Sequence, residues 1–249
     1  MESPKSSAAD AQSSYTQRTG TSEIFNRFET VIADTAALKH ECFALRYMAY
    51  CEDHDWLTHE NRFNPDKIEK DIYDVHSVHG LLLHKGTGLF FGTVRLILYD
   101  PSSSGCSFPV QVLCTNNKIS LPELAPLWNT AEISRFCIPK RCRKTILDYE
   151  EEAASKQLAS SYPTSDALLI ALVRVLVALA RQNNIQQWYA EMEPRLIERL
   201  EKLGIFYDKI GPPIEFHGTR QICHKKLDEW FERVHCERPD IWGLISNED

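Results

Sequence analysis

Residues 131–138, Ala-Glu-Ile-Ser-Arg-Phe-Cys-Ile, and residues 186–192, Gln-Gln-Trp-Tyr-Ala-Glu-Met, are the two stretches that decide the fold. Each has the composition and alternation of a strand. The apolar run 167–180 between them predicts a helix that begins at Thr164 or Ser165 and ends near Asn183. This strand, helix and strand favour an α/β sheet covered by helices.

Upstream of this unit the sequence predicts a helix and a hairpin. Asp34 is a suitable cap for a helix that carries apolar residues at Leu38, Cys42, Leu45 and Ala49. Residues 78–83 and 90–99 predict two antiparallel strands joined by a turn at 85–88. The stretches 56–74 and 101–128 are expected to be mostly irregular.

Downstream, a helix is expected from Pro194 to Gly204, which suit the first turn and the residue after the last turn. Two closing strands, 205–210 and 214–217, are expected on either side of Gly-Pro-Pro. A final amphipathic helix carries Leu227, Trp230, Phe231 and Val234. Because strand–helix–strand units are mixed with a hairpin, we predict a mixed sheet with helices on both faces.

Composition limits the class of protein. Of 249 residues, 43% are hydrophobic and the net charge is −7, which argues against a general nucleic-acid binder. Residues 1–22 are rich in Ser and Thr and predict a disordered tail without a signal peptide, followed by one domain over 23–249. The longest apolar run is too short to span a bilayer. Eight cysteines without a Cys-x-x-Cys pair indicate free thiols in the cytoplasm.

Five short motifs occur in a characteristic order along the chain. They are Leu45-Arg-Tyr47, Trp56, Glu69-x-Asp71-x-x-Asp74, Gly92-Thr-Val-Arg-Leu96 and Glu132-Ile-Ser-Arg-Phe136. This run resembles the signature of acyl-homoserine-lactone (autoinducer) synthases. The later stretch 188–220 is more similar to N-acyl amino acid synthases and to acyltransferases associated with PEP-CTERM/exosortase systems. The resemblance covers about residues 24–220.

The resemblance implies a GNAT fold, an α/β fold with a central, mostly antiparallel sheet and helices on both faces. One parallel strand pair, 131–138 and 186–192, would splay apart and bind the pantetheine arm of an acyl thioester. The implied function is N-acyl transfer from acyl carrier protein (ACP) or acyl-CoA, as co-substrate, to the amine of an amino acid or related metabolite. No permanently bound cofactor is expected. An acyl-homoserine-lactone synthase that uses S-adenosylmethionine and an inactive acyl- or carrier-binding module are the alternatives.

Glu132, Ser134 and Arg135 are the candidate catalytic residues. Acyl transfer to an amine requires removal of a proton, and Glu132 begins the strand beside the expected cleft. Its alternative role is an ion pair with Arg135 or Arg95.

The candidate acceptor-binding residues combine charged side chains with one aromatic residue. Arginines form forked hydrogen bonds with carboxylates, so they could bind a substrate carboxylate, hold the acidic residues in place, or form a purely structural network. The acidic residues could instead cap an irregular segment. These candidates are Arg46, Trp56, Glu69, Asp71, Asp74 and Arg95.

The candidate donor-binding residues lie at and after the end of strand 131–138. The basic run 139–144 lacks the Gly-x-Gly of GNAT pyrophosphate loops and precedes about twenty inserted residues. A binding surface for acidic ACP is therefore favoured over a standard binding loop for the coenzyme A pyrophosphate. The alternative is a charged face that contacts only solvent. Aromatic residues could line an acyl tunnel or belong to the core. The candidates are Phe136, Cys137, Ile138, Arg141, Arg143, Lys144 and Trp188.

His76 and His79 lie near Asp71 and Asp74, which raises the question of a metal site. Positions three apart on a strand point to opposite faces, so no metal is expected. With no transmembrane segment, contact with a membrane would be peripheral and through the acyl product.

Overall fold

The computed structural model describes residues 26–53, 64–103, 106–120, 127–154 and 164–246. The predicted tail 1–22 and Trp56 lie outside these residues. Seven strands form one sheet in the order β1-β2-β3-β4-β5-β7-β6. Every neighbouring pair is antiparallel except β4 and β5, which are parallel. The predicted mixed α/β, GNAT-like architecture is therefore confirmed.

The strands have the following bounds: β1 Phe28–Ile32, β2 Ser77–His84, β3 Leu89–Leu98, β4 Thr130–Cys137, β5 Gln187–Met192, β6 Asp208–Glu215 and β7 Thr219–Lys226. The α-helices are α2 Ala36–Tyr47, α4 Pro109–Asn116, α5 Lys140–Ala154, α6 Thr164–Gln182, α7 Pro194–Lys202, α8 Leu227–Glu237 and α9 Pro239–Ile245. The chain after α2 continues as a π-helical turn, η1 Met48–Glu52, and two short 3₁₀ helices are η2 Ile72–His76 and η3 Leu127–Asn129.

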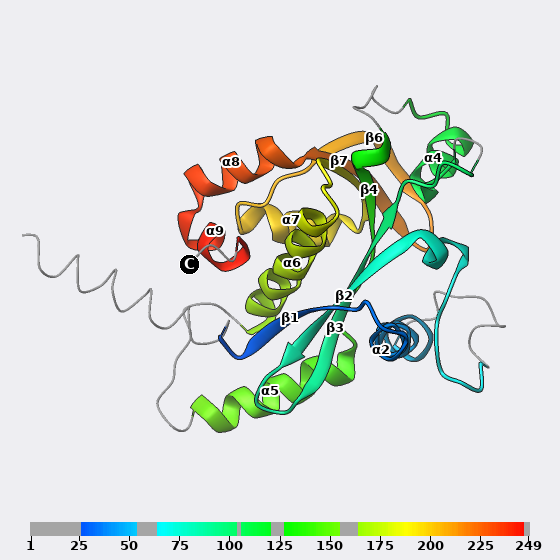
Figure 1. Ribbon diagram of the computed structural model, residues 1–249. Coiled ribbons are helices and arrows are strands. Elements are labelled where there is room, and N and C mark those ends of the chain that lie inside the picture. Colours follow the sequence, from blue (N-terminus) through cyan, green and yellow to red (C-terminus); the bar gives the residue numbers. More distant parts are fainter. Residues whose placement is uncertain (1–25, 54–63, 104–105, 121–126, 155–163, 247–249) are drawn as a thin grey trace, which may run out of the picture.

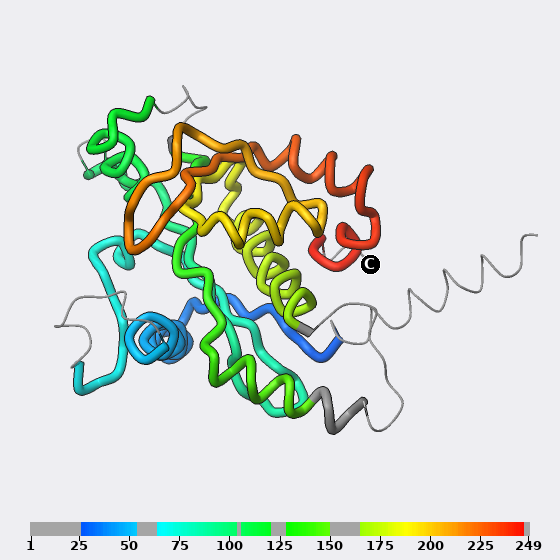
Figure 2. The backbone as a smooth tube through the Cα atoms, turned by 180° about the vertical axis from the view of Figure 1, so that it is seen from behind, coloured from blue at the N-terminus to red at the C-terminus, as the bar shows by residue number. Residues whose placement is uncertain are grey.

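Helices cover both faces of the sheet, as Figure 1 shows. α2 contacts β2, β3 and β4 on one face, whereas α6 contacts β1, β2 and β3 on the other. Seen from behind in Figure 2, α5 runs beside the β2–β3 hairpin, and α8 and α9 lie at the end of the molecule away from it. α6 is apolar on nearly all sides, because it is enclosed by the sheet, α5 and α9. Burial of this helix anchors the core. Among the helices in the described ranges, none combines the length and the apolar character needed to cross a membrane.

One local prediction was wrong, and three elements were not predicted. The cap of α2 is Thr35, whose Oγ1 accepts a hydrogen bond from the Leu38 amide at 3.2 Å, and Asp34 is not the cap. The stretch 101–128 contains α4, which begins with a proline at its first position, where the missing N–H is not needed. The charged segment after residue 139 is helix α5, which buries Cys142 and Ile146 on one side. β1 was not predicted.

The closing strands were also assigned incorrectly. Residues on both sides of Gly211-Pro-Pro213 belong to one strand, β6, which is irregular between Ile210 and Ile214. Its partner is β7, reached through the turn at 216–218. Two prolines are tolerated because β6 is an edge strand, whose outer amides need no partner in the sheet.

Gly80 sets how closely α6 approaches β2. A Cβ atom at this residue would lie 2.3 Å from Cγ1 of Val175 on α6. The absence of a side chain therefore allows the helix to pack directly on the strand backbone.

We expect Gly80→Ala to lower the free energy of unfolding by about 1–3 kcal/mol, because the added methyl group overpacks the contact between α6 and β2. Gly243→Ala is the matched control: Gly243 lies in α9, and a Cβ added there would have no atom within 4 Å. That variant should be neutral or more stable by up to about 1 kcal/mol. Urea unfolding of both variants measures the difference; equal stabilities would contradict this account of the helix contact.

Candidate active site

The parallel strands β4 and β5 separate after a short paired stretch. Residues 130–133 of β4 pair with residues 187–190 of β5, and no pairing continues beyond Ile133 and Ala190. At the same level β4 is irregular against β3, and Arg135 has a φ of 52°. A positive φ at a residue other than glycine is uncommon, and within a strand it is local strain of the kind that clusters at functional sites. The predicted splayed pair is thus present, with a bulge beside the opening.

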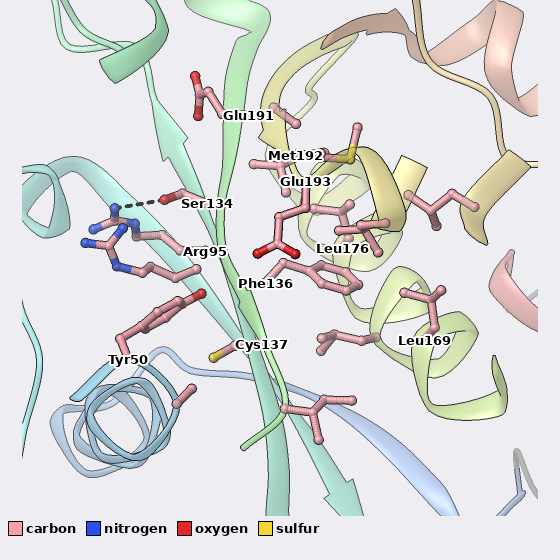
Figure 3. Close-up of a pocket in the computed structure, with 18 of the residues that line it drawn as sticks. Tyr50, Arg95, Ser134, Phe136, Cys137, Leu169, Leu176, Glu191, Met192 and Glu193 are labelled. Carbon is pink, nitrogen blue, oxygen red and sulfur yellow. Dashed lines mark hydrogen bonds between the residues drawn. The ribbon is translucent and has the colours of Figure 1, made fainter. Parts of the chain in front are cut away.

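A cavity of about 730 Å³ lies at this opening. Figure 3 shows its residues on both sides of β4: Tyr50, Arg95, Ser134 and Glu191 lie on one side, and Phe136, Leu169, Leu176 and Met192 lie on the other. The cavity therefore extends past the edge of β4 from one face of the sheet to the other. The second side is apolar, and α6 contributes Leu168, Leu169, Leu172, Val173 and Leu176 to it.

The polar side rests on a network of three arginines and three acidic residues. Arg46 binds Glu69, and its Nη1 lies 2.7 Å from Oδ1 of Asp74. Nη1 of Arg95 lies 2.6 Å from Asp71 and 2.8 Å from Asp74. Nη2 of Arg135 lies 2.9 Å from both Glu69 and Asp71. The formal charges of the six groups cancel.

The same network is locked to the backbone. Asp71 caps η2 by accepting a hydrogen bond from the Tyr73 amide, and Asp74 accepts one from the Asp71 amide, so the predicted capping role of both residues is present. Burial alone would raise the pKa of Asp74, but hydrogen bonds and the charges of Arg46 and Arg95 outweigh it and hold that pKa below its usual range. Arg95 also donates to Oγ of Ser134 at 3.0 Å. These contacts fix the side chains before any substrate arrives.

His76 and His79 do not converge. His76 Nε2 lies 3.1 Å from the carbonyl oxygen of Ser107, whereas His79 Nε2 lies 3.7 Å from Asp74. Burial, assisted by the charge of Arg46, lowers the pKa of His79 to about 4, so its ring is neutral at neutral pH. Within the described ranges, no three His, Cys, Asp or Glu residues are grouped closely enough to hold a metal ion.

Glu132 lies outside the arginine network. It is 1% exposed and its Oε2 accepts a hydrogen bond from the Val110 amide, in the first turn of α4, at 2.8 Å. Its other contact is a hydrogen bond with Glu191 of β5, a residue that sequence analysis did not select. The alternative role for Glu132, a direct ion pair with Arg95 or Arg135, is not what the structure shows within the described residues.

Tyr50 is a second residue that sequence analysis missed. It comes from the π-helical turn η1, lines the cavity and hydrogen-bonds with Cys137, while the guanidinium of Arg135 lies 5.4 Å from its ring centre. Burial raises the pKa of the Cys137 thiol to about 12, so this thiol stays protonated. π-helical turns are frequent at functional sites, but the sequence gives no signal for one here.

The predicted donor-binding residues separate into three groups. Phe136, Cys137, Ile138 and Arg143 line the cavity. Arg141 and Lys144 are exposed on α5 and do not line it. Trp188 is completely buried in the core, with its ring centre 5.5 Å from that of Trp230, so the structure does not support a place in the tunnel.

The start of α5 is capped from within the chain. The Lys140 amide donates to Oδ2 of Asp53 at 2.5 Å, and Lys140 Nζ donates to the Asp53 carbonyl oxygen at 2.8 Å. Arg143 Nε donates to the carbonyl oxygen of Ile138 at 2.9 Å. An acidic side chain therefore already occupies the helix terminus at which a phosphate group would otherwise be stabilised.

Comparison with known proteins agrees with this architecture. Residues 45–149 match the model of a family described as an acetyltransferase (GNAT) domain. None of the curated proteins matches the sequence.

Solved structures share the fold at low sequence identity. TofI, in a ternary complex with an inhibitor and MTA, is 15% identical with a TM-score of 0.56 over 88% of this chain and 97% of its own. BjaI, a CoA-dependent acyl-homoserine lactone synthase with SAM and isopentyl-CoA, is 19% identical with a TM-score of 0.55 over 85% and 88%. FeeM, an N-acyl amino acid synthase from uncultured soil microbes, is 11% identical with a TM-score of 0.50 over 85% and 96%. The chain has a GNAT-like fold, and the resemblance expected from the sequence is confirmed at that level.

The ion-pair network predicts how stability depends on pH. Because the pKa of Asp74 is depressed in the folded protein, its contribution is present above the unfolded pKa of about 4 and is lost as pH falls below that value. Asp74→Asn leaves Arg46 and Arg95 under-compensated, so we expect a loss of about 3–5 kcal/mol at pH 7.

Urea unfolding at pH 7 and at lower pH measures this effect. The difference in free energy of unfolding between wild type and Asp74→Asn should become smaller at the lower pH. The exposed Asp66→Asn is the control and should change stability by less than about 0.5 kcal/mol. A difference between Asp74→Asn and wild type that does not change with pH would show that the carboxylate charge is not the cause.

Proposed function

We propose that the protein is an N-acyltransferase that moves a fatty acyl group from a thioester to the amine of an amino acid or related metabolite. The observation that carries the proposal is the cavity at the opening between β4 and β5, apolar along α6 and polar on the other face of the sheet. Such a cavity suits an acyl chain on one side and an amine on the other. The reaction joins the two at the gap.

The separated strand edge supplies a place for the thioester. Beyond Ile133 the side of β4 that faces β5 has no strand partner, so its backbone groups are available to a bound extended arm. A backbone N–H in this segment could donate to the carbonyl oxygen as it becomes negatively charged during attack by the amine. The apolar side chains Phe136, Leu169 and Leu176 would then surround the acyl chain.

Two features favour an acyl carrier protein over acyl-CoA as donor. Asp53 already caps the start of α5, which leaves less room for the phosphates of coenzyme A. Arg141 and Lys144 are exposed on the first turns of the same helix and could contact an acidic carrier. We therefore propose an acidic carrier protein as the donor's partner.

The acceptor would bind on the polar side. There Arg95, Arg135 and Asp71 line the cavity, but each guanidinium is already paired with a carboxylate. We propose that these side chains orient the acceptor through the shape and hydrogen bonds of a neutral network rather than through a free positive charge. Ser134 lies at the same wall.

The direct test is to incubate the purified protein with acyl-ACP or acyl-CoA and a panel of amino acids, and to identify products by mass spectrometry. An N-acyl amino acid supports the proposal. A lactone formed only with S-adenosylmethionine would instead indicate a homoserine-lactone synthase. Binding of the acylated carrier without any product would indicate an inactive binding module.

Glu132→Gln keeps the size of the side chain and an acceptor for the Val110 amide but removes a proton acceptor. We expect kcat to fall about 10²-fold, the scale of general-base catalysis, with little change in thermal stability. Glu198→Gln, on the exposed side of α7, is the matched control and should turn over normally. Normal turnover by a folded Glu132→Gln protein would remove Glu132 from the mechanism.

The double variant Arg141→Glu/Lys144→Glu tests the carrier surface. We expect KM to rise about tenfold or more for acyl-ACP and to change little for an acyl-pantetheine thioester, because only the carrier presents a broad acidic surface. The effect should weaken as salt is added. Lys118→Glu/Lys202→Glu, two exposed lysines elsewhere, provides the same charge change as a control. Equal losses with both donors would contradict a carrier contact.

A further inference from the structure

Glu191 and Glu132 form a carboxyl pair at the point where the sheet opens. Glu191 directly follows Ala190, the last residue of β5 that pairs with β4. Glu132 lies opposite Tyr189, two positions before Glu191, and side chains two positions apart on a strand share one face. The two carboxyl groups hydrogen-bond with each other, and both line the cavity.

The four carboxyl oxygens have different surroundings. Oε2 of Glu132 accepts the hydrogen bond from the Val110 amide. The carboxyl groups of Glu132 and Glu191 also hydrogen-bond with each other. Oε1 of Glu191 is buried and has no hydrogen-bond partner within the part of the chain that the structure describes. No N–H group within the described residues therefore neutralises this oxygen, whereas Glu132 is held by the Val110 amide.

Glu132 is buried and Glu191 is half-buried. Two carboxyl groups in contact at such a site cannot both be ionised without a cost, so they share a proton. Burial raises the pKa of both Glu132 and Glu191; the charge of Glu191 raises the pKa of Glu132 further, whereas the hydrogen bond with Glu132 lowers the pKa of Glu191 in part. A hydrogen bond between two carboxyl groups itself requires that at least one is protonated. The pair therefore carries one proton and one negative charge over a range of pH around neutrality.

The groups around the pair are arginines, phenols, thiols and one histidine. The arginines approach the pair from three strands. Burial raises the pKa values of the nearby phenols and thiols, and burial lowers the pKa of the His224 ring, which packs on Tyr189. The charged and titratable neighbours are Arg95 of β3, Arg135 of β4, Arg220 of β7, Tyr73 of η2, Cys114 of α4, Tyr189 of β5 and Cys223 of β7.

We propose that Glu132 and Glu191 act as one proton-accepting unit, and that the carboxyl group of Glu191 takes the proton of the acceptor amine. This inference rests on the proposed N-acyl transfer and names a catalytic residue for it. Glu132 is then the positioning residue, because it is held by the Val110 amide and keeps the shared proton between the two side chains.

The proton and electron balance is as follows. The amine enters as an ammonium ion and gives one proton to the carboxyl group of Glu191, so the pair becomes neutral with two protons. The free amine attacks the thioester carbonyl, the C–N bond forms, and the C–S bond breaks with its electron pair on sulfur. The second proton of the attacking nitrogen passes to that sulfur to give a thiol. Release of one proton from the pair to water restores the starting state.

The first test is a double-mutant cycle in kcat. We expect Glu191→Gln and Glu132→Gln each to lower kcat about 10²-fold, and the double variant to lose little more than either single one, because residues that act as a unit are not additive. Glu198→Gln again serves as the control. Normal turnover by Glu191→Gln, or losses that multiply in the double variant, would overturn the proposal.

The second readout is the pH dependence of kcat/KM, which a merely structural role would not shift. Activity requires the singly protonated pair, so it should rise with pH through the raised pKa of the pair. Glu191→Gln removes the like charge beside Glu132 and can donate a hydrogen bond to it, so the acidic limb should move to lower pH by about one unit or more. An acidic limb at the same pH in wild type and variant would contradict a shared proton.

A third measurement does not depend on catalysis. Infrared difference spectra of the wild-type protein should show a protonated carboxyl group that persists near neutral pH and disappears in either Glu→Gln variant. If the protein forms no N-acyl product but this signal is present, the proposed function fails while the shared proton stands. If product forms but the signal is absent, the function stands and the carboxyl pair is rejected.

Discussion

The early end of the parallel pairing between β4 and β5 is the constraint on which the rest of the site depends. Only four residues of β4 pair with β5, and the bulge at Arg135 follows directly in β4. A left-handed conformation at a residue other than glycine costs of order 1–2 kcal/mol. Arg135 offsets this cost through its hydrogen bonds to Glu69 and Asp71, which also fix its direction. The ion-pair network therefore stabilises the bulge beside the opening.

This dependence explains why two buried arginines, Arg46 and Arg95, and the partly exposed Arg135 lie so close to one another. Each bare guanidinium would be expensive in the interior, but three carboxylates neutralise them and two of those carboxylates are held by the backbone of η2. A rigid, neutral wall is the result. Its hydrogen bonds can orient a polar acceptor, yet it leaves the negative charge of the Glu132–Glu191 pair as the local excess charge on this side. An ammonium group would be attracted to that charge, which is the form in which an amine arrives at neutral pH.

The sequence predicted correctly those elements whose hydrophobic periodicity matches the secondary structure that they adopt. The β2–β3 hairpin, β4, α6 and β5 have clear periodicity. The three arginines do lie together with Asp71 and Asp74, but their third partner is Glu69 and not Glu132. The prediction failed where the position of a residue in the folded sheet, and not its local sequence, decides its structure. The prolines of β6 resemble a turn but lie on a sheet edge, and Trp188 is core because α8 covers its face with Trp230.

Glu191 was missed for a different reason, and its signal was present in the sequence. A glutamate between Ala190 and Met192, in a strand of otherwise buried residues, requires either a cation or a shared proton. The neighbouring arginines are paired with Glu69, Asp71, Asp74 and Glu193, so the sheet places this carboxyl against Glu132 instead. The position of Glu191 connects the two halves of the cavity. The opening between β4 and β5 would admit an extended thioester, and the carboxyl pair lies at the same opening, where an amine would meet the thioester.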